Sequence, residues 1–361
     1  MIFKDTDPLK EERLNIIDKE GKVINDELLP KIKKDTLLHM YKTMILGRIA
    51  DEKAVQFQRQ GRMLTYAPNI GQEAAQAGPM AAMEDQDWLV LAFRELSAML
   101  YKGIPLEQIY LYWYGNEMGS KYADNLNVLP INVPIGSQIS HAAGVAYANK
   151  LKENDQATIA FIGEGGTSHG EFHEGINFAA TFNVPLIIVI QNNQYAISTP
   201  VGQATKSKTL AQKAIAYGIK GIQVDGNDPL AMYLATQEAR KRVMNDEGPI
   251  LIEAVTYRMG PHTTSDNPSL YRSDEEVAKW KERDPIKRFR TYLTDKKYWS
   301  KKKDEALYDD TKKDVIETFK KVEKSGEVPL EDIFSHMYGT MPEHLKKQYE
   351  DYKRYLNEEG Q

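Results

Sequence analysis

The sequence has 361 residues, 41% of them hydrophobic, and a formal net charge of −5 at pH 7. It is long enough to bury a large core, and its mild negative charge, with basic and acidic residues interspersed, argues against a nucleic-acid partner. The sequence contains no cysteine, which excludes disulfides, thiol nucleophiles and zinc–thiolate sites within it.

Residues 1–34 are predicted to form a peripheral N-terminal extension. Residues 1–18 are polar and acidic rather than apolar or arginine-rich, so we expect no secretory or transit signal. Lys19-Glu20-Gly21 separates two short apolar stretches and predicts a hairpin turn. No apolar run approaches the ~18 residues of a membrane span, and we therefore expect a cytoplasmic protein without membrane contact.

Two helices are predicted next. The first begins at Asp35 or Thr36, whose side-chain oxygen can cap the first turn, and ends at Gly61. Its apolar positions recur at helical spacing. The second covers residues 72–83, which are rich in Ala and Met, and we expect it to be buried.

Short, continuous apolar runs then alternate with helical segments. We expect strands at 157–162, 186–190, 222–224 and 250–255, and helices at 170–183 and 229–245. This alternation is typical of a parallel sheet that helices cover on both faces. From residue 275 the pattern becomes amphipathic and helical. We therefore predict one α/β domain over residues 35–345, with a central parallel sheet, helical extensions at both ends and a C-terminal tail at 346–361.

Two polar clusters follow neighbouring strands of this sheet, where ligands of open parallel sheets bind. Gly163-Glu164-Gly165-Gly166 follows one strand, and Asn192-Asn193-Gln194-Tyr195 follows the next. A carboxylate, an amide oxygen and a backbone carbonyl can meet there, and such ligands suit magnesium or calcium. The glycines allow close approach of a diphosphate. One Gly-acid-Gly is usually an ordinary turn, but the paired clusters favour a metal-bridged diphosphate site.

The stretch from Gly163 to Ser198 resembles the thiamine diphosphate motif of the alpha subunits of 2-oxo acid dehydrogenases. The resemblance implies thiamine diphosphate and Mg²⁺ as cofactors, with the metal bound by Glu164, Asn193 and the backbone carbonyl of Tyr195. Gly165 and Gly166 fall within the same cofactor-binding motif. Glu164 departs from the family, which carries Asp there. The additional methylene bears on metal affinity and metal preference, because magnesium demands a strict octahedron.

Three further segments resemble the same family. Phe93-Arg94 matches a Tyr-Arg pair in which the arginine binds the diphosphate, although Phe93 lacks the tyrosine hydroxyl. Ile135 lies in a segment similar to the one that cradles the aminopyrimidine, and by this match it holds the cofactor bent. Residues 257–266 resemble the loop that lines the active-site channel. This match implies that His262, our candidate catalytic residue, contacts the diphosphate and helps to order the loop.

The resemblance also implies a reaction and partners. The expected reaction is oxidative decarboxylation of a small 2-oxo acid, with transfer of the acyl group to the lipoyl group of an acyltransferase component. A separate beta subunit would complete an α2β2 heterotetramer. The segments 66–73 and 260–262 are more similar to bacterial enzymes that act on pyruvate, which makes acetyl transfer the leading expectation. A branched-chain 2-oxo acid or acetoin enzyme remains an alternative. The departure at Glu164 leaves a non-catalytic scaffold paralogue as a second one.

Overall fold

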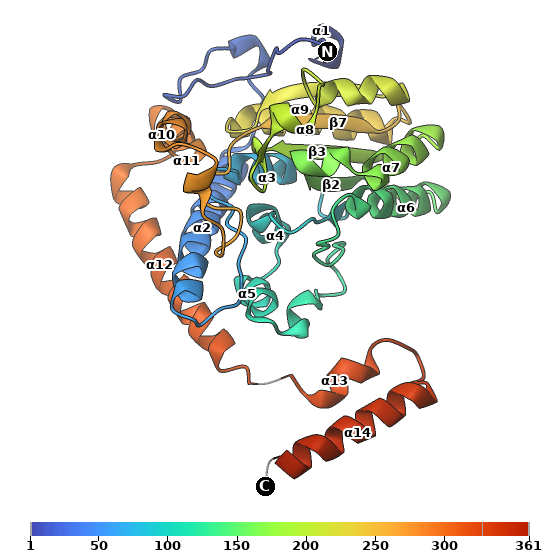
Figure 1. Ribbon diagram of the computed structural model, residues 1–361. Helices are drawn as coiled ribbons and strands as arrows, with labels where there is room; N and C mark the ends of the chain where they lie inside the picture. The colour runs from blue at the N-terminus through green and yellow to red at the C-terminus, as the bar shows by residue number, and fades with distance from the viewer. Residues whose placement is uncertain (1, 327, 360–361) are drawn as a thin grey trace.

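A computed structural model describes residues 2–326 and 328–359. Within these residues a five-stranded parallel sheet forms the centre of the molecule, with strand order β1-β2-β3-β7-β6 (Figure 1). The predicted α/β class with a central parallel sheet is therefore confirmed. The edge strand β1 was not predicted, because three residues are too few for an apolar pattern to show. The strands are β1 (Trp88–Val90), β2 (Thr158–Gly163), β3 (Leu186–Asn192), β6 (Lys220–Asp225) and β7 (Ile250–Val255).

Both faces of the sheet are buried. Successive residues of a strand point to opposite faces, so each strand contributes side chains to two hydrophobic layers. On β2, Ile159 and Phe161 belong to one hydrophobic cluster, and Ala160 and Ile162 belong to the other. Each face is therefore covered by helices, as the continuous apolar strands predicted. On the first face lie α3 (Glu73–Ala82) and α9 (Pro229–Met244), with α2 (Lys34–Arg59) packed against α3; on the second lie α6 (Ser137–Leu151), α7 (Gly170–Thr181) and the 3₁₀ segment η4 (Ala211–Tyr217).

A second group of helices packs against α2 at the side of the sheet (Figure 1). The rings of Phe57 on α2 and Phe319 on α12 stack with centroids 3.9 Å apart. This contact joins the beginning of the domain to its end. The group consists of α4 (Leu96–Lys102), α5 (Leu106–Tyr114), α11 (Pro285–Asp295) and α12 (Lys301–Glu323). Helix α10 (Asp274–Lys281) lies outside this group, and its Trp280 ring stacks on Tyr257.

The beginning of α2 differs from the prediction. The helix begins at Lys34 after an extended Lys33, and no side chain of the described residues caps it. The capping expected from Asp35 or Thr36 was wrong, because both residues already lie inside the first turn. The predicted end was correct: α2 ends at Arg59, and Gly61 has a left-handed φ of +71°.

The N-terminal extension contains the predicted turn. Ile17 and Val23 form an antiparallel bridge, and the Asp18 N–H donates to the Lys22 carbonyl oxygen over 2.9 Å. Leu14 pairs with Val224 on β6 in parallel, which fastens the extension to the sheet edge. The shorter elements are α1 (Ile2–Asp5), η1 (Asp26–Leu28), η2 (Glu117–Ser120), η3 (Glu164–Ser168), β4 (Tyr195–Ala196), β5 (Thr199–Pro200), α8 (Val201–Ala204) and η5 (Pro268–Leu270).

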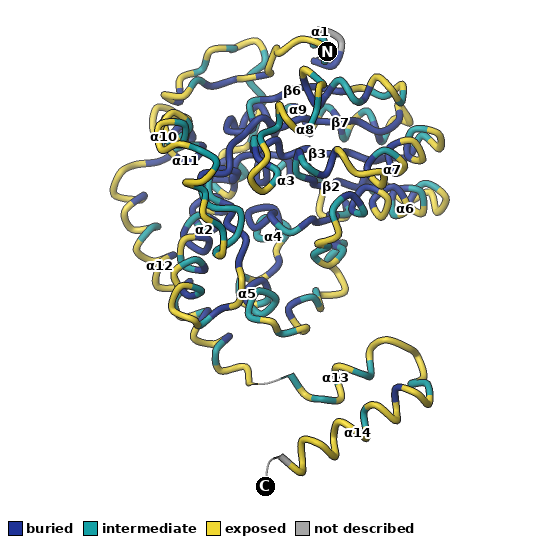
Figure 2. Tube along the Cα trace, viewed as in Figure 1, coloured by how far each residue is buried: buried dark blue, intermediate teal, exposed yellow. Residues whose placement is uncertain are grey.

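The last two helices, α13 (Leu330–Ser335) and α14 (Glu343–Glu359), form an arm that extends away from the body (Figure 1). They pack on each other and are mostly exposed (Figure 2). Helix α14 crosses the proposed boundary between the domain and the tail, and residues 1, 327 and 360–361 lie outside the described chain. Among the described helices, none is both long and apolar enough to cross a membrane.

Candidate functional site

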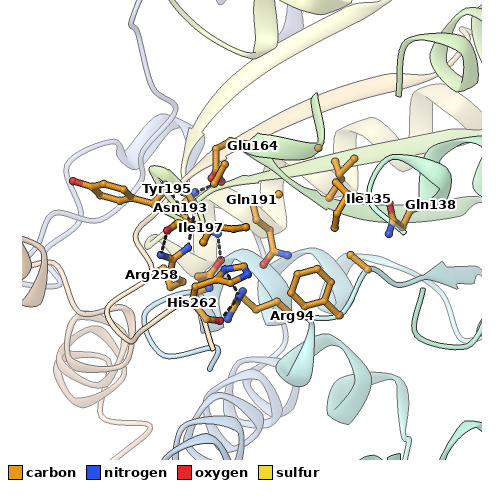
Figure 3. Close-up of a pocket in the computed structure, with 18 of the residues that line it drawn as sticks. Arg94, Ile135, Gln138, Glu164, Gln191, Asn193, Tyr195, Ile197, Arg258 and His262 are labelled. Atoms are coloured by element: carbon orange, nitrogen blue, oxygen red, sulfur yellow. Dashed lines mark hydrogen bonds between the residues drawn. The ribbon is translucent and has the colours of Figure 1, made fainter. Parts of the chain in front are cut away.

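The two polar clusters meet at the carboxyl edge of the sheet. Strands β2 and β3 pair in register, with Gly163 opposite Gln191, so η3 and the Asn193 turn begin side by side. Both clusters line a cavity of about 200 Å³. The sequence-predicted site residues all line the same cavity: Phe93, Arg94, Ile135, Glu164, Gly165, Gly166, Asn193, Tyr195 and His262 (Figure 3).

The three proposed metal ligands are brought together by local hydrogen bonds. Glu164 is only 3% exposed, and its Oε2 accepts the Asn193 N–H over 3.1 Å. The Asn193 side chain donates from Nδ2 to Oε1 of Gln72 over 3.2 Å, which leaves its Oδ1 on the opposite side of the amide. The Tyr195 carbonyl oxygen accepts from Arg258 over 2.8 Å. A carbonyl oxygen has a second lone pair, so this bond still leaves it a ligand position.

The Glu164 carboxylate lies in an environment that opposes its charge. Burial raises its pKa, while the backbone N–H groups of Glu164 and Asn193 and the guanidinium groups of Arg258 and Arg94 counter that rise. A divalent cation at this position would offset the same desolvation. The carboxylate, the Asn193 amide oxygen and the Tyr195 carbonyl oxygen are all hard donors, and this donor set fits Mg²⁺.

The glycines of η3 are required by close approach of the backbone. A Cβ on Gly165 would lie 2.6 Å from the Cβ of Ala196, and one on Gly166 would lie 2.5 Å from Cδ1 and Cγ1 of Ile162. The Gly166 Cβ would also lie 3.2 Å from Cγ2 of Ile135. The turn after β2 is therefore held against both β4 and the Ile135 segment, and backbone forms part of the cavity wall.

Arg94 and His262 lie together across the cavity from Ile135 (Figure 3). The guanidinium of Arg94 donates to the carbonyl oxygens of Pro68 and His262, the latter over 2.8 Å. It also lies 3.3 Å from Nδ1 of His262. Because an arginine can only donate, Nδ1 must accept, and the proton of a neutral His262 is on Nε2. Phe93 completes this wall, with its ring centroid 6.4 Å from that of His262.

His262 is neutral at ordinary pH. Burial, reinforced by the guanidinium groups of Arg94 and Arg258, lowers its pKa to about 4. Burial and the neighbouring Arg258 also lower the pKa of Arg94 to about 10. Positive charge is therefore concentrated here without a full set of anionic partners, and an anionic ligand would relieve the repulsion.

The loop that carries His262 is tied down from both ends. The His262 N–H donates to Oδ2 of Asp266 over 2.7 Å, and the Tyr271 hydroxyl donates to the same carboxylate oxygen. Arg272 donates to three successive carbonyl oxygens, those of residues 258, 259 and 260. The predicted loop of residues 257–266 thus lies at the cavity, and hydrogen bonds hold it in place.

Two buried nitrogen atoms indicate what the cavity can hold. Nε2 of Gln72 and Nε of Arg258 have no hydrogen-bond partner among the described residues, although both side chains line the cavity. Buried donors without partners are costly unless a ligand accepts from them. Together with the guanidinium groups of Arg94 and Arg258, they fit an anionic group such as a diphosphate beside a divalent cation.

Several lining residues carried no assigned function in the sequence. Gln72, Glu95 and Gln138 line the cavity together with Gln191 and Arg258. The sequence offered a signal for two of them. Arg258 lies in the 257–266 segment, and Gln191 is a polar residue at the end of an apolar strand. Glu95 is adjacent to Arg94, but nothing in its local sequence indicates where its carboxylate points.

The fold and site define an α/β protein with a cavity at the carboxyl ends of parallel strands, and the lining of this cavity fits an anionic cofactor and a metal. The sequence profile of the dehydrogenase E1 component family matches residues 41–331, and the chain belongs to this family. A protein of Acholeplasma laidlawii is 57% identical over 341 residues, 94% of this chain and 99% of that protein. One of Bacillus cereus is 42% identical over 343 residues, 95% and 92% of the two chains. Both are named pyruvate dehydrogenase E1 component subunit alpha.

Proposed function

We propose that this chain is the alpha subunit of a pyruvate dehydrogenase E1 component, which oxidatively decarboxylates pyruvate and transfers the acetyl group to the lipoyl group of an acyltransferase component. The observation that carries the proposal is the convergence of Glu164, Asn193, Tyr195, Arg94 and His262 on one cavity. The identity to relatives of that name over almost the whole chain supports the choice of substrate.

We propose thiamine diphosphate and Mg²⁺ as the cofactors. When bound, thiamine diphosphate supplies a carbanion that adds to a keto carbon and an electron sink for the loss of carbon dioxide. Glu164, Asn193 and the Tyr195 carbonyl would hold the metal, and the backbone of Gly165 and Gly166 would lie against the diphosphate. Ile135 would hold the organic part of the cofactor from the opposite wall.

The cationic wall would bind and orient the diphosphate. Arg94 has N–H groups left after its bonds to Pro68 and His262, because a guanidinium has five donors. Neutral His262 keeps an Nε2–H donor, so it can bind an anion without adding a third positive charge to those of Arg94 and Arg258. Phe93 contributes an apolar ring, which limits water beside these groups.

The partners follow from the proposed subunit. A beta subunit would complete the active site in an α2β2 heterotetramer, and the acyltransferase component would receive the acetyl group. The cavity of about 200 Å³ is smaller than the ~300–1,000 Å³ of usual ligand pockets, which supports a site shared with another chain. We place the assembly in the cytoplasm, a reducing compartment that suits a chain without cysteine.

The deciding experiment is an oxidation assay on the natural assembly. The tagged chain is purified from its host with its partners, and reduction of an artificial electron acceptor is followed with pyruvate or a branched-chain 2-oxo acid. Each assay is run with and without thiamine diphosphate and MgCl₂. We expect cofactor-dependent turnover of pyruvate and copurification of a second subunit. Preference for the branched acid would overturn the substrate.

A variant separates the site from the fold. Asn193→Ala removes one proposed metal ligand and should abolish turnover, because Mg²⁺ demands a nearly complete octahedron. The variant should still copurify with the second subunit. Full activity of Asn193→Ala would contradict the metal site. Failure of the wild-type assembly to turn over any 2-oxo acid would favour a scaffold instead.

A further inference from the structure

A closed ring of hydrogen bonds lies beside the cavity. We call it the Glu95 ring: the carboxylate of Glu95, the side-chain amides of Gln191 and Gln76, and the backbone N–H and C=O of Arg94. Glu95 accepts from the Arg94 N–H over 2.9 Å and from Nε2 of Gln191 over 2.7 Å. Gln191 accepts from Nε2 of Gln76 over 3.0 Å, and Gln76 also donates to the Arg94 carbonyl oxygen over 2.7 Å. Side chains therefore hold both polar groups of the Arg94 peptide backbone.

The ring connects three elements that are distant in the sequence. Gln76 belongs to α3, Gln191 to β3, and Arg94 and Glu95 to the connection between β1 and α4. The side chains of Gln76, Glu95 and Gln191 are each at most 2% exposed. Because these side chains are almost completely buried, a lost bond would leave a buried polar group unpaired. Gln191 also lies two residues before Asn193, so the ring joins the proposed metal-binding turn to the arginine wall.

The environment fixes the direction of every bond in the ring. The Ser97 N–H donates to Oε1 of Gln76 over 2.9 Å, so Nε2 of Gln76 must face Gln191 and Arg94. Oε1 of Gln191 then faces Gln76, and its Nε2 faces Glu95. Glu95 accepts from Gln191 and from the backbone N–H groups of Arg94 and Ala92 and has no acceptor to donate to, which is the pattern of a carboxylate. Burial raises its pKa to about 7, and these donors counter that rise. A glutamine at position 95 would place an N–H group against another donor.

The N-terminus of α4 leaves Glu95 available for this task. Glu95 occupies the N-cap position, yet its side chain does not bond to the first turn of the helix. The free N–H groups of that turn are satisfied instead by Asn69, which accepts from the Leu96 N–H over 3.1 Å, and by Gln76 at Ser97. Because other side chains cap α4, the Glu95 carboxylate turns back to Arg94.

We propose that Glu95 is a positioning residue, which acts through the Glu95 ring to aim the Arg94 guanidinium at the diphosphate of the cofactor. The ring holds the backbone of Arg94, while Pro68 and His262 hold the guanidinium end. Because the backbone and the guanidinium of Arg94 are both held, its remaining N–H groups point in one direction. Binding of the ligand therefore costs little side-chain entropy at Arg94. The inference rests on the proposed cofactor site.

A charge-swapped pair of variants tests the ring. Glu95→Gln creates a donor–donor conflict in the ring. Combining it with Gln191→Glu restores every bond, because the new amide at position 95 accepts from the Arg94 N–H and donates to the new carboxylate at position 191, which also accepts from Gln76. Glu107→Gln, an exposed change on α5, is the matched control. Isothermal titration calorimetry on the copurified assembly measures binding of thiamine diphosphate with MgCl₂, and of inorganic pyrophosphate as a probe of the arginine wall alone.

We expect Glu95→Gln to weaken binding of both probes by about tenfold, the loss typical of a misplaced charged hydrogen bond. The pyruvate KM and the kcat at saturating cofactor should change much less. The swapped double variant should bind both probes within about threefold of wild type, like Glu107→Gln. If the single variant does not assemble, the double variant alone decides, because it keeps every bond of the ring.

Two results would overturn the proposal. One is wild-type affinity in Glu95→Gln. The other is a double variant as weak as the single one, which would mean that charge at position 95 matters rather than the hydrogen bonds. These results differ from failure of the proposed function, in which the wild-type assembly itself would bind neither thiamine diphosphate nor pyrophosphate.

Discussion

Glu164 is the residue at which this site departs from the family resemblance. Two substitutions separate the effect of its charge from the effect of its side-chain length. Glu164→Gln removes the charge but keeps an oxygen that can accept the Asn193 N–H. We expect this variant to lose Mg²⁺-dependent binding of thiamine diphosphate by about tenfold or more, because a neutral amide is a weaker ligand for a hard cation. Calorimetric titration of the assembly at several MgCl₂ concentrations measures the effect.

Glu164→Asp is the control for length. It keeps the charge and restores the residue that the resembling family carries, so its Mg²⁺-dependent binding should stay close to that of wild type. Equal binding by Glu164→Gln and wild type would show that this carboxylate is not a metal ligand. A loss in Glu164→Asp as large as that in Glu164→Gln would show that the extra methylene is needed for the local geometry.

His262 should couple cofactor binding to pH. Its pKa is lowered to about 4 by burial and by the guanidinium groups of Arg94 and Arg258. A bound diphosphate neutralises those groups and therefore raises the pKa of His262. The bound state then holds more protons on this residue than the free state, so its contribution to affinity grows as the pH falls from 7 toward 5.

The coupling can be measured as proton uptake. Calorimetry at pH 6 in two buffers of different ionisation enthalpy reports the protons that are exchanged when pyrophosphate binds to the assembly. Wild type should take up more protons than His262→Asn, which keeps a polar side chain but cannot titrate. Subtracting the variant also removes the protons of pyrophosphate itself. Equal uptake by the two proteins would rule out coupling through His262.

At the scale of elements, the close approach of η3 to β4 predicts a difference between neighbouring glycines. A Cβ on Gly165 would lie 2.6 Å from that of Ala196, whereas one on Gly163 would meet no described heavy atom within 4 Å. Gly163 has a φ of −74°, which alanine adopts easily. Gly165→Ala should therefore destabilise the cofactor-free assembly by about 1–3 kcal/mol through overpacking.

Gly163→Ala is the matched control for that substitution. It should change stability by less than about 1 kcal/mol, and in the stabilising direction, because alanine restricts the unfolded chain more than glycine does. Thermal unfolding of the cofactor-free assemblies compares the two variants. Equal melting temperatures of Gly165→Ala and Gly163→Ala would contradict the tight packing of η3 on β4.

The elements also show which parts of the fold local sequence could predict. Strands β2 and β3 have continuous apolar runs, because both faces of the sheet are buried, and they were predicted. Strands β6 and β7 were also predicted, although Gln223 and Glu253 interrupt their apolar residues. Strand β1 has three residues and was missed. The cap of α2 was misjudged because Asp35 and Thr36 are favourable N-cap types, but the preceding chain sets where the helix begins. The preference of a residue type for the N-cap position is a local property, whereas the residue at which the helix begins depends on tertiary contacts.

For the whole molecule, the candidate site was predictable where a motif marked it. Glu164 and Asn193 follow strands, and Arg94 and His262 stand in segments with a recognisable pattern, so their placement at one cavity was expected. The Glu95 ring was not predictable. Gln76 and Gln191 are 115 residues apart, and a glutamine carries no local signal of the partner it will meet. Such contacts appear only once the layers are assembled.

The size of the cavity leads to a prediction for the whole chain. A site of about 200 Å³ covers part of a cofactor for which pockets of ~300–1,000 Å³ are usual. The isolated chain should therefore bind thiamine diphosphate with MgCl₂ at least about tenfold more weakly than the assembly, since each methylene-sized group left in water costs about 0.8 kcal/mol. Circular dichroism first establishes that the isolated chain is folded, and calorimetry then compares the two preparations. Adding the purified second subunit to the isolated chain should restore the affinity, but should not do so for Asn193→Ala, because that variant lacks its own metal ligand. Equal affinity of the isolated chain and the assembly would mean that this chain alone forms the complete cofactor site.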